Sequence, residues 1–206
     1  MLEFLQAGGP FMYVLVATSI IALALILERS LALRWGRVIP PTVEETMISC
    51  RDQEDVDRLR LLCEESNSPL SRLLVTAVDH LNLPRSDTVE ALQTQARHII
   101  VQLERGLVFL EIIVGIAPLM GLVGTIHGLI RMFGDLGKTG LGDNSVVAAG
   151  IAIALNTTLT GLLIAIPSLV AWSYYSKKVE VMAIEMERLC DEFVRHQYRR
   201  KKSSKP

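Results

Sequence analysis

The chain has 206 residues, enough for one ordinary domain, and half of them are hydrophobic. Charged residues still make up 21% of the chain, so charge is segregated from the apolar runs, as in a membrane protein with sizeable water-exposed parts. The formal net charge of −1 gives no indication of a nucleic-acid partner.

Three runs of the sequence carry no Asp, Glu, Lys or Arg. They are 18, 19 and 33 residues long and extend over 10–27, 112–130 and 144–176. Because a bilayer core about 30 Å thick needs about 20 helical residues, we expect three transmembrane helices and an all-α membrane protein. The predicted segments are an N-terminal periplasmic or interfacial segment at 1–9, helix 1 at 10–31, a cytoplasmic helical region at 32–106, helix 2 at 107–131, a periplasmic loop at 132–145, helix 3 at 146–174, and a cytoplasmic helix with a basic tail at 175–206.

The first apolar run has a second interpretation, as a cleaved signal peptide. A signal peptide begins with basic residues, whereas only the acidic Glu3 precedes this run. Glu28 and Arg29 follow it, in place of a small-residue cleavage site. Both features favour a retained transmembrane helix.

The distribution of basic residues predicts the orientation of the helices. None of the 21 Lys and Arg residues precedes helix 1, ten lie within 28–106, two within 131–145, and nine follow Ser176. Because basic loops stay in the cytoplasm, we expect a periplasmic N-terminus and a cytoplasmic C-terminus.

The region between helices 1 and 2 is predicted to be helical. RWGR at 34–37 would anchor the chain at the inner membrane interface, before two prolines break it. Short helices follow, separated by the turn SNSP at 66–69, and a longer helix starts near Asp87 and runs into helix 2. Helix 3 continues into an amphipathic stretch, so helices 2 and 3 are both expected to extend into a cytoplasmic bundle.

Motifs that would indicate an enzyme are incomplete or misplaced. GKT at 137–139 resembles the end of a phosphate-binding loop, but position 132 is Met where that motif needs Gly. NTT at 156–158 matches a glycosylation sequon but lies inside a membrane helix. No Ser/His/Asp or Cys/His set gathers on one side of the membrane, so we predict no enzyme, metal site or cofactor. Three cysteines lack metal-ligand spacing and are expected as reduced cytoplasmic thiols: Cys50, Cys63 and Cys190.

Helices 2 and 3 each carry a stripe of small residues, which let membrane helices approach closely. The helix 2 stripe shares one face and contains Gly121, Gly124 and Gly128, with Pro118 and Thr125 beside it. The helix 3 stripe has intervals of four and three residues and contains Ala154, Thr158, Gly161, Ala165 and Ser168. Pro118 and Pro167 would each free a backbone carbonyl.

Four polar side chains lie together in the middle of helix 3: Asn156, Thr157, Thr158 and Thr160. For any single Thr, a bond to the carbonyl four residues back in its own helix is the structural alternative to a functional role. Asn156 needs a partner or a wet cavity, because an unpaired amide in hydrocarbon costs several kcal/mol. We therefore predict a packed, partly hydrated helix interface.

Asp, Glu, Lys and Arg are missing from the middle of each predicted span, and Glu111, at the cytoplasmic end of helix 2, is the nearest carboxylate. A proton path normally needs an ionisable relay. If protons pass along these threonines, the titrating carboxylate must come from another chain.

Three stretches together resemble one family: AGGPFMYVLVATSIIALALILER at 7–29, IAPLMGLVGTIHGLI at 116–130, and AAGIAIALNTTLTGLLIAIPSLVAW at 148–172. They resemble the MotA/TolQ/ExbB family of proton-channel proteins, most closely ExbB and TolQ, over essentially the whole chain. MotA itself resembles a longer chain with four spans, so three predicted spans argue against a flagellar stator subunit.

The resemblance implies a ring-forming homo-oligomer, a pentamer, in the lipid bilayer of the bacterial inner membrane. The ring would surround a pair of single-span ExbD/TolR-like partners that carry the titratable Asp, and a TonB/TolA-like protein is a further candidate partner. Helices 2 and 3 would line the pore, with Thr125 and Thr158 matching the family's pore threonines. Proton motive force would then energise outer-membrane transport or envelope maintenance.

One position departs from the family pattern. Many ExbB and TolQ sequences have Glu in a GI(A/S)EAL motif where this chain has Ile153, in GIAIAL. Asn156 is the candidate to take over hydrogen bonding or water ordering there, although it cannot titrate.

A static oligomeric scaffold that recruits partners through its cytoplasmic helices is the alternative function, because small-residue faces also serve pure oligomerisation. An intramembrane enzyme has no supporting residues. The sequence leaves open an ExbB or a TolQ role, the process energised, and H⁺ or Na⁺ as the coupling ion.

Overall fold

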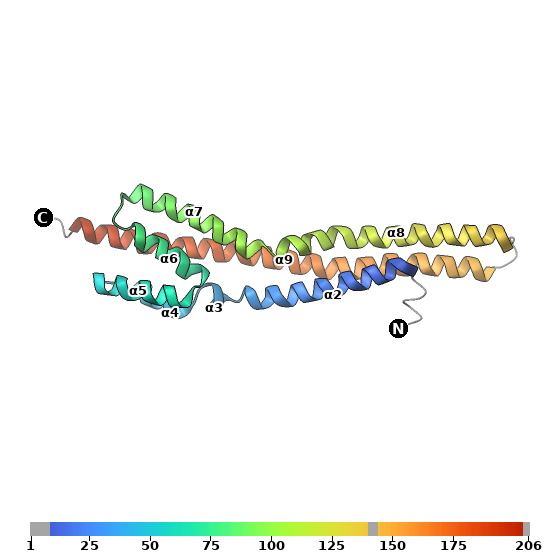
Figure 1. Cartoon of the computed structure of the whole chain (residues 1–206), viewed down its shortest axis with the longest axis horizontal. Coiled ribbons are helices and arrows are strands. Elements are labelled where there is room, and N and C mark those ends of the chain that lie inside the picture. Colours follow the sequence, from blue (N-terminus) through green and yellow to red (C-terminus); the bar gives the residue numbers. More distant parts are fainter. Residues whose placement is uncertain (1–8, 140–143, 204–206) are drawn as a thin grey trace. The chain divides into compact units, whose positions relative to one another are not determined.

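The computed structural model describes residues 9–139 and 144–203 as helices joined by short turns (Figure 1). In chain order the helices are α2 (Gly9–Ala32), α3 (Trp35–Val38), α4 (Pro41–Ser49), α5 (Gln53–Ser66), α6 (Pro69–His80), α7 (Arg85–Glu104), α8 (Leu107–Thr139) and α9 (Asn144–Ser203). By length and composition, α2, α8 and α9 can each cross a membrane. The prediction of an all-α chain with three candidate membrane spans is thereby confirmed.

The chain divides into two compact units. The first contains residues up to Arg29 together with 106–174, and the second contains 30–105 together with the residues from Tyr175 onward. Helix α9 is continuous from Asn144 to Ser203 and contributes residues to both units, in agreement with the predicted extension of helix 3.

The first unit is built from α2, α8 and the first part of α9. A small apolar core joins the three helices and contains Leu15, Ala22, Ile113, Ala117, Ile164 and Ala165. Most of the remaining large apolar side chains on these helices are exposed. Helices that are apolar around most of their circumference are suited to lipid, where every backbone hydrogen bond must be made within the protein.

Helices α7 and α8 are separated by a turn at Arg105 and Gly106, although the sequence predicted one helix running into the span. A Cβ added at Gly106 would lie 2.5 Å from Nε of Arg29, so the turn packs under that guanidinium group. This contact joins residues far apart in the sequence, and helical periodicity cannot reveal it. The start of α7 also differs, because the helix begins at Arg85 and not at the predicted Asp87.

The region predicted as a loop at 132–145 is largely helical. Helix α8 continues to Thr139 and α9 begins at Asn144, and residues 140–143 lie outside the described ranges. The GKT stretch at 137–139 is therefore part of a helix.

The second unit is a set of short amphipathic helices and the second part of α9 around one apolar core. Helices α4 and α6 each begin with proline, whose missing N–H has no helical partner at that position anyway. A reciprocal capping box between Asp52 and Asp55 starts α5, and Asn67, at φ 45°, ends it. The predicted turn at 66–69 is thus confirmed.

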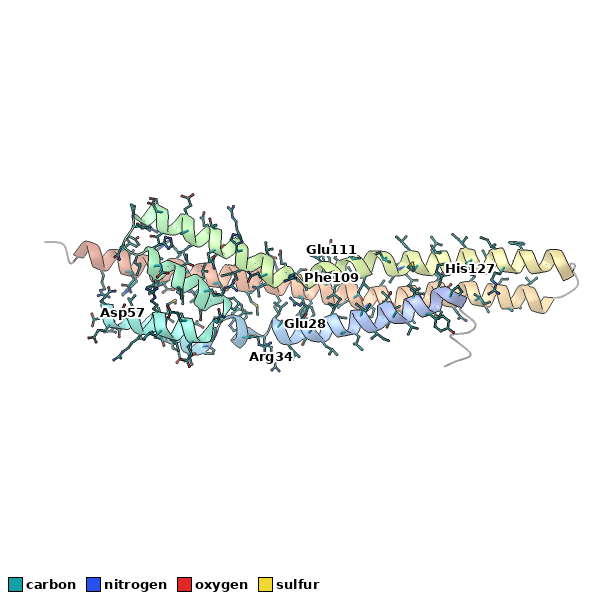
Figure 2. All side chains as sticks on the ribbon, viewed as in Figure 1. Glu28, Arg34, Asp57, Phe109, Glu111 and His127 are labelled. Carbon is teal, nitrogen blue, oxygen red and sulfur yellow. The ribbon has the colours of Figure 1, made fainter. Side chains whose placement is uncertain are left out.

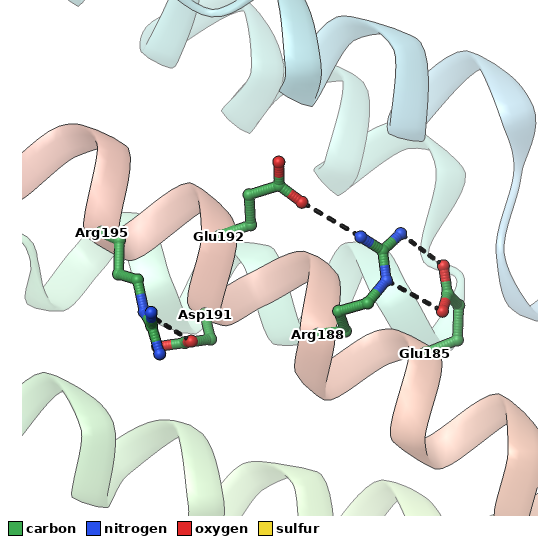
Figure 3. A network of polar contacts seen from close by, with 5 residues as sticks. All are labelled: Glu185, Arg188, Asp191, Glu192 and Arg195. Atoms are coloured by element: carbon green, nitrogen blue, oxygen red, sulfur yellow. Dashed lines mark hydrogen bonds and ion pairs between the residues drawn. The ribbon is translucent and has the colours of Figure 1, made fainter.

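Ion pairs cover the exposed side of α9 in the second unit (Figure 3). Arg188 contacts Glu185 at 2.7 Å and Glu192 at 3.2 Å, and Arg195 contacts Asp191 at 2.7 Å. Exposed pairs of this kind contribute about 0–1 kcal/mol each. They therefore identify a water-facing surface more than they stabilise the fold.

Candidate functional site

Glycines of α8 bring its backbone into direct contact with α9. A Cβ added at Gly121 would lie 3.0 Å from the carbonyl oxygen of Thr157, and one at Gly124 would lie 2.8 Å from Thr157 Cβ. A Cβ at Gly128 would lie 3.2 Å from Cγ2 of Ile153. Ordinary contacts of this kind begin at 3.4 Å, so any larger residue at these positions displaces its neighbour.

Glycines of α9 extend the contact in both directions. A Cβ added at Gly161 would lie 2.6 Å from the carbonyl oxygen of Ala117, and one at Gly150 would lie 2.5 Å from Met132 Cβ. Between Ala117 and Met132 the α8 helix rises about 22 Å, which is most of a bilayer core. Gly150 is not among the packing residues predicted from the sequence, although it stands four residues before Ala154 and continues the same spacing.

Two hydroxyl groups join the helices in the middle of this contact. The side chains of Thr125 and Thr158 hydrogen-bond to each other. Thr125 Oγ1 also lies 3.0 Å from the carbonyl oxygen of Ala154 on α9, and Thr158 Oγ1 lies 3.4 Å from that of Gly121 on α8. Each hydroxyl has one proton to donate, so these bonds are alternatives that can exchange.

The other two threonines of the polar cluster bond within their own helix. Thr157 is fully buried against Gly124, and its hydroxyl donates to the carbonyl oxygen of Ala154 at 2.9 Å. Thr160 Oγ1 donates to the carbonyl oxygen of Asn156 at 2.8 Å. Of the three threonine hydroxyls in this cluster, only that of Thr158 bonds across to α8 within the described residues.

Asn156 and Ile153 are both half-buried on α9. Ile153 packs against Gly128, so this position supplies an aliphatic contact. The hydrogen bonds found over 9–139 and 144–203 include none from the side-chain amide of Asn156. That amide is therefore available to water or to a group from another chain.

Of the other predicted packing residues, the two alanines are buried, Pro118 is half-buried and Pro167 is exposed. Ala154 and Ala165 are buried, and Ala165 belongs to the core shared with α2. Pro118 and Pro167 lie inside α8 and α9 without ending either helix, and each lacks the N–H that would bond the carbonyl four residues earlier.

Charged side chains are absent from the described α8–α9 contact. Glu111 is exposed near the start of α8 (Figure 2). His127 lies farther along α8, half-buried, with its ring edge-on to Phe11 of α2 at a centroid distance of 5.4 Å. Nowhere in the described ranges do three or more His, Cys, Asp or Glu side chains gather as metal ligands.

The three cysteines lie in the core of the second unit. Burial raises the pKa of the Cys50 and Cys63 thiols to about 11, and it raises the pKa of Cys190 as well. All three therefore stay protonated near neutral pH, and protonated thiols are poor nucleophiles and poor metal ligands.

Comparison with known proteins identifies the family. The sequence model of the MotA/TolQ/ExbB proton channel family matches residues 65–188. The chain belongs to this family. It is 33% identical to the ExbB-like 1 protein of Synechocystis sp., over 82% of this chain and 68% of that protein. It is 30% identical to the ExbB homolog of Methanothermobacter thermautotrophicus, over 87% and 64%, and 32% identical to biopolymer transport protein ExbB of Helicobacter pylori, over 50% and 66%.

The matched regions span about two thirds of the length of each of these relatives. Family membership and the three apolar helices together indicate an ExbB-type proton-channel subunit of the bacterial inner membrane. Thr125 and Thr158, whose hydroxyls meet between α8 and α9, both lie within the residues that the family model matches.

Proposed function

We propose that the chain is the pore-forming subunit of an inner-membrane motor driven by proton motive force. In this proposal five copies surround a pair of single-span ExbD/TolR-like partners, with α8 and α9 facing the partners. The Thr125–Thr158 pair is the observation that carries the proposal. It joins two apolar helices through hydroxyls that remain partly exposed, so a neighbouring chain or water can reach them.

The pair would conduct protons to a carboxylate on the partner. A hydroxyl donates one hydrogen bond and accepts others, so it passes a proton along without holding a charge itself. Protonation of the partner's Asp would remove the cost of moving a carboxylate past apolar helices. One charge crossing 100 mV releases about 2.3 kcal/mol, so each proton drives a small step. The work would energise outer-membrane transport or envelope maintenance, with a TonB/TolA-like protein as the next component.

Asn156 would assist this path, because the resemblance places a carboxylate at position 153 and this chain has Ile153 there. Its amide has no partner among the described residues and lies one helical turn from Ile153. An amide can order water or bond to the partner, but it cannot titrate. Unchanged proton-dependent activity in an Asn156→Leu variant would exclude this role.

The central test is Thr158→Val, with Thr160→Val as its matched control. Both changes replace a hydroxyl by a methyl on α9, but only Thr158 bonds across to α8. We expect Thr158→Val to lower proton uptake by proteoliposomes containing the chain and its single-span partner by about tenfold or more. Native mass measurement of the same preparation should show an intact complex. If both variants retain wild-type uptake, the Thr158 hydroxyl is structural and the proposed path is wrong.

A static oligomeric scaffold is the second candidate, because the close packing of α8 on α9 at small residues needs no proton movement. The scaffold predicts that an uncoupler leaves the cellular phenotype unchanged. It also predicts that the chain, co-expressed with its neighbouring genes, forms a homo-oligomer that retains no Asp-bearing single-span protein. Retention of such a protein in mild detergent would support the motor.

A further inference from the structure

A basic pocket lies in the second unit, where the chain leaves α2. Its volume is about 820 Å³, and it is lined by Leu31, Arg34, Trp35, Gly36, Arg37 and Lys178. Lys178 comes from α9, so two segments distant in the sequence bring three cationic side chains to one pocket.

The local backbone holds the two arginines on the same side. Leu33, Val38 and Ile39 are buried, so they anchor the segment at both ends and leave residues 34–37 exposed. The amide of Val38 donates to the carbonyl oxygen of Arg34 at 3.2 Å, and this turn places Arg34 and Arg37 one helical turn apart.

Arg37 is also directed toward the end of α2. Its Nη1 lies 3.5 Å from the carbonyl oxygen of Leu31 in the last turn of that helix. The guanidinium group therefore lies beside this carbonyl while its other donors stay exposed.

The positive charge of the two arginines is not neutralised by nearby acids. Over the described ranges, no ion pair includes Arg34 or Arg37. Glu28, six residues before Arg34, is already paired with Arg29 at 2.5 Å, and Glu180, two residues after Lys178, is paired with Lys177 at 2.8 Å. The pocket is therefore suited to an anion from outside the chain.

The position of these residues along the chain indicates which anion. The uncharged run of α2 ends at Leu27 and that of α9 ends at Ser176, so the pocket residues follow two apolar spans by a few positions each. Phospholipid headgroups lie at that depth, where Trp and basic residues concentrate. Leu31 is 55% exposed and Trp35 is 44% exposed, which leaves apolar surface beside the cations for the start of an acyl chain.

We propose that this pocket binds the headgroup of an anionic phospholipid of the inner leaflet. Arg34 and Arg37 would bond to the phosphate, whose oxygens match the paired donors of guanidinium groups. Lys178 would add a third cation, and Trp35 would lie at the level of the glycerol backbone. The inference is independent of the proton path, because it involves no residue of the α8–α9 contact.

The test compares Arg34→Gln/Arg37→Gln with Arg58→Gln/Arg97→Gln in the full chain. Arg58 and Arg97 are also exposed and outside the ion pairs of the described residues, so both variants lose two charges. Native mass spectrometry in nonionic detergent would count bound phosphatidylglycerol and bound phosphatidylcholine with the same acyl chains. Each cation near a membrane surface accounts for about fivefold in affinity, so the pocket variant should bind phosphatidylglycerol about thirtyfold more weakly. The control variant should bind as wild type does.

A fluorescence measurement covers the case in which the pocket variant folds poorly. The chain has two tryptophans, so Trp172→Phe leaves Trp35 as the reporter. Phosphatidylglycerol with brominated acyl chains should quench Trp35 fluorescence more strongly than brominated phosphatidylcholine does. Inorganic phosphate at roughly 10 to 50 mM, which screens surface charge only in part, should not reverse this quenching.

Three outcomes would overturn the proposal. The two lipids binding equally would show that headgroup charge is not recognised. Equal weakening in the two double variants would show a diffuse charge effect with no defined pocket. Displacement of the lipid by inorganic phosphate would identify a site for a free anion.

Discussion

Gly161→Ala should separate α8 from α9 and weaken the first unit. The new Cβ would lie 2.6 Å from the carbonyl oxygen of Ala117, which is backbone and cannot rotate away, and 3.2 Å from Cα of Gly121. Restoring an ordinary 3.4 Å contact requires a displacement of roughly 0.8 Å. The same displacement would lengthen the bond between Thr125 and the Ala154 carbonyl, now 3.0 Å, beyond hydrogen-bonding range.

The magnitude follows from two opposing effects. Overpacking of a close contact costs about 1–3 kcal/mol, whereas replacing Gly by Ala in a helix returns about 0.5–1 kcal/mol. A net loss of about 1–2 kcal/mol corresponds to a fall of about 2–8 °C in the thermal midpoint for a chain of this size. Circular dichroism in nonionic detergent would measure it.

Gly115→Ala is the matched control, because a Cβ added at Gly115 meets nothing within 4 Å. That variant should have the wild-type midpoint or a slightly higher one, since it gains helix propensity without a clash. If Gly161→Ala and Gly115→Ala unfold at the same temperature, the close approach of the two backbones is wrong.

Two further outcomes concern the turn before α8 and the core of the second unit. Gly106→Ala should lower the thermal midpoint less than Gly161→Ala does. The new Cβ at position 106 would meet the Arg29 guanidinium group, which is the movable end of a long side chain. A larger loss than in Gly161→Ala would contradict this. Burial raises the pKa of the Cys63 thiol from 9.0 to about 11, so the unfolded chain releases this proton before the folded chain does. This contribution to stability is fully present below pH 9 and is lost as pH rises to 11. Cys63→Ala lacks it, so the thermal midpoint of this variant should fall less steeply than that of wild type between pH 9 and pH 11. Equal slopes for the two proteins would exclude the effect.

Helical periodicity was sufficient to place several residues on common faces, because it is a local property of the chain. Gly121, Gly124 and Gly128 recur at helical spacing, and the structure sets that face against α9. The same reasoning could not choose among the threonines. Thr157 and Thr158 are neighbours, yet one faces Gly124 and bonds within its own helix while the other reaches Thr125. Which hydroxyl crosses depends on the rotation of one helix against the other, and that rotation is a tertiary property.

Long-range contacts explain the other differences between sequence and structure. The turn at Arg105 and Gly106 is packed under Arg29, a residue on α2. The contact between Phe11 and His127 likewise joins α2 to α8. Neither pair has a periodic signal, since each depends on how α2 lies along α8.

The neutrality of the α8–α9 contact has a consequence for how pH acts on the assembly. Its described bonds join hydroxyls to hydroxyls and to backbone carbonyls, and none of these groups titrates near neutral pH. Ile153 places an aliphatic side chain against Gly128, which adds no titrating group to the contact. The packing of the two helices is therefore expected to be the same on both sides of the pKa of a carboxyl group. Under the proposed function, any proton-dependent change in that range originates in the partner chain, and the threonine pair supplies the path while its own charge stays constant.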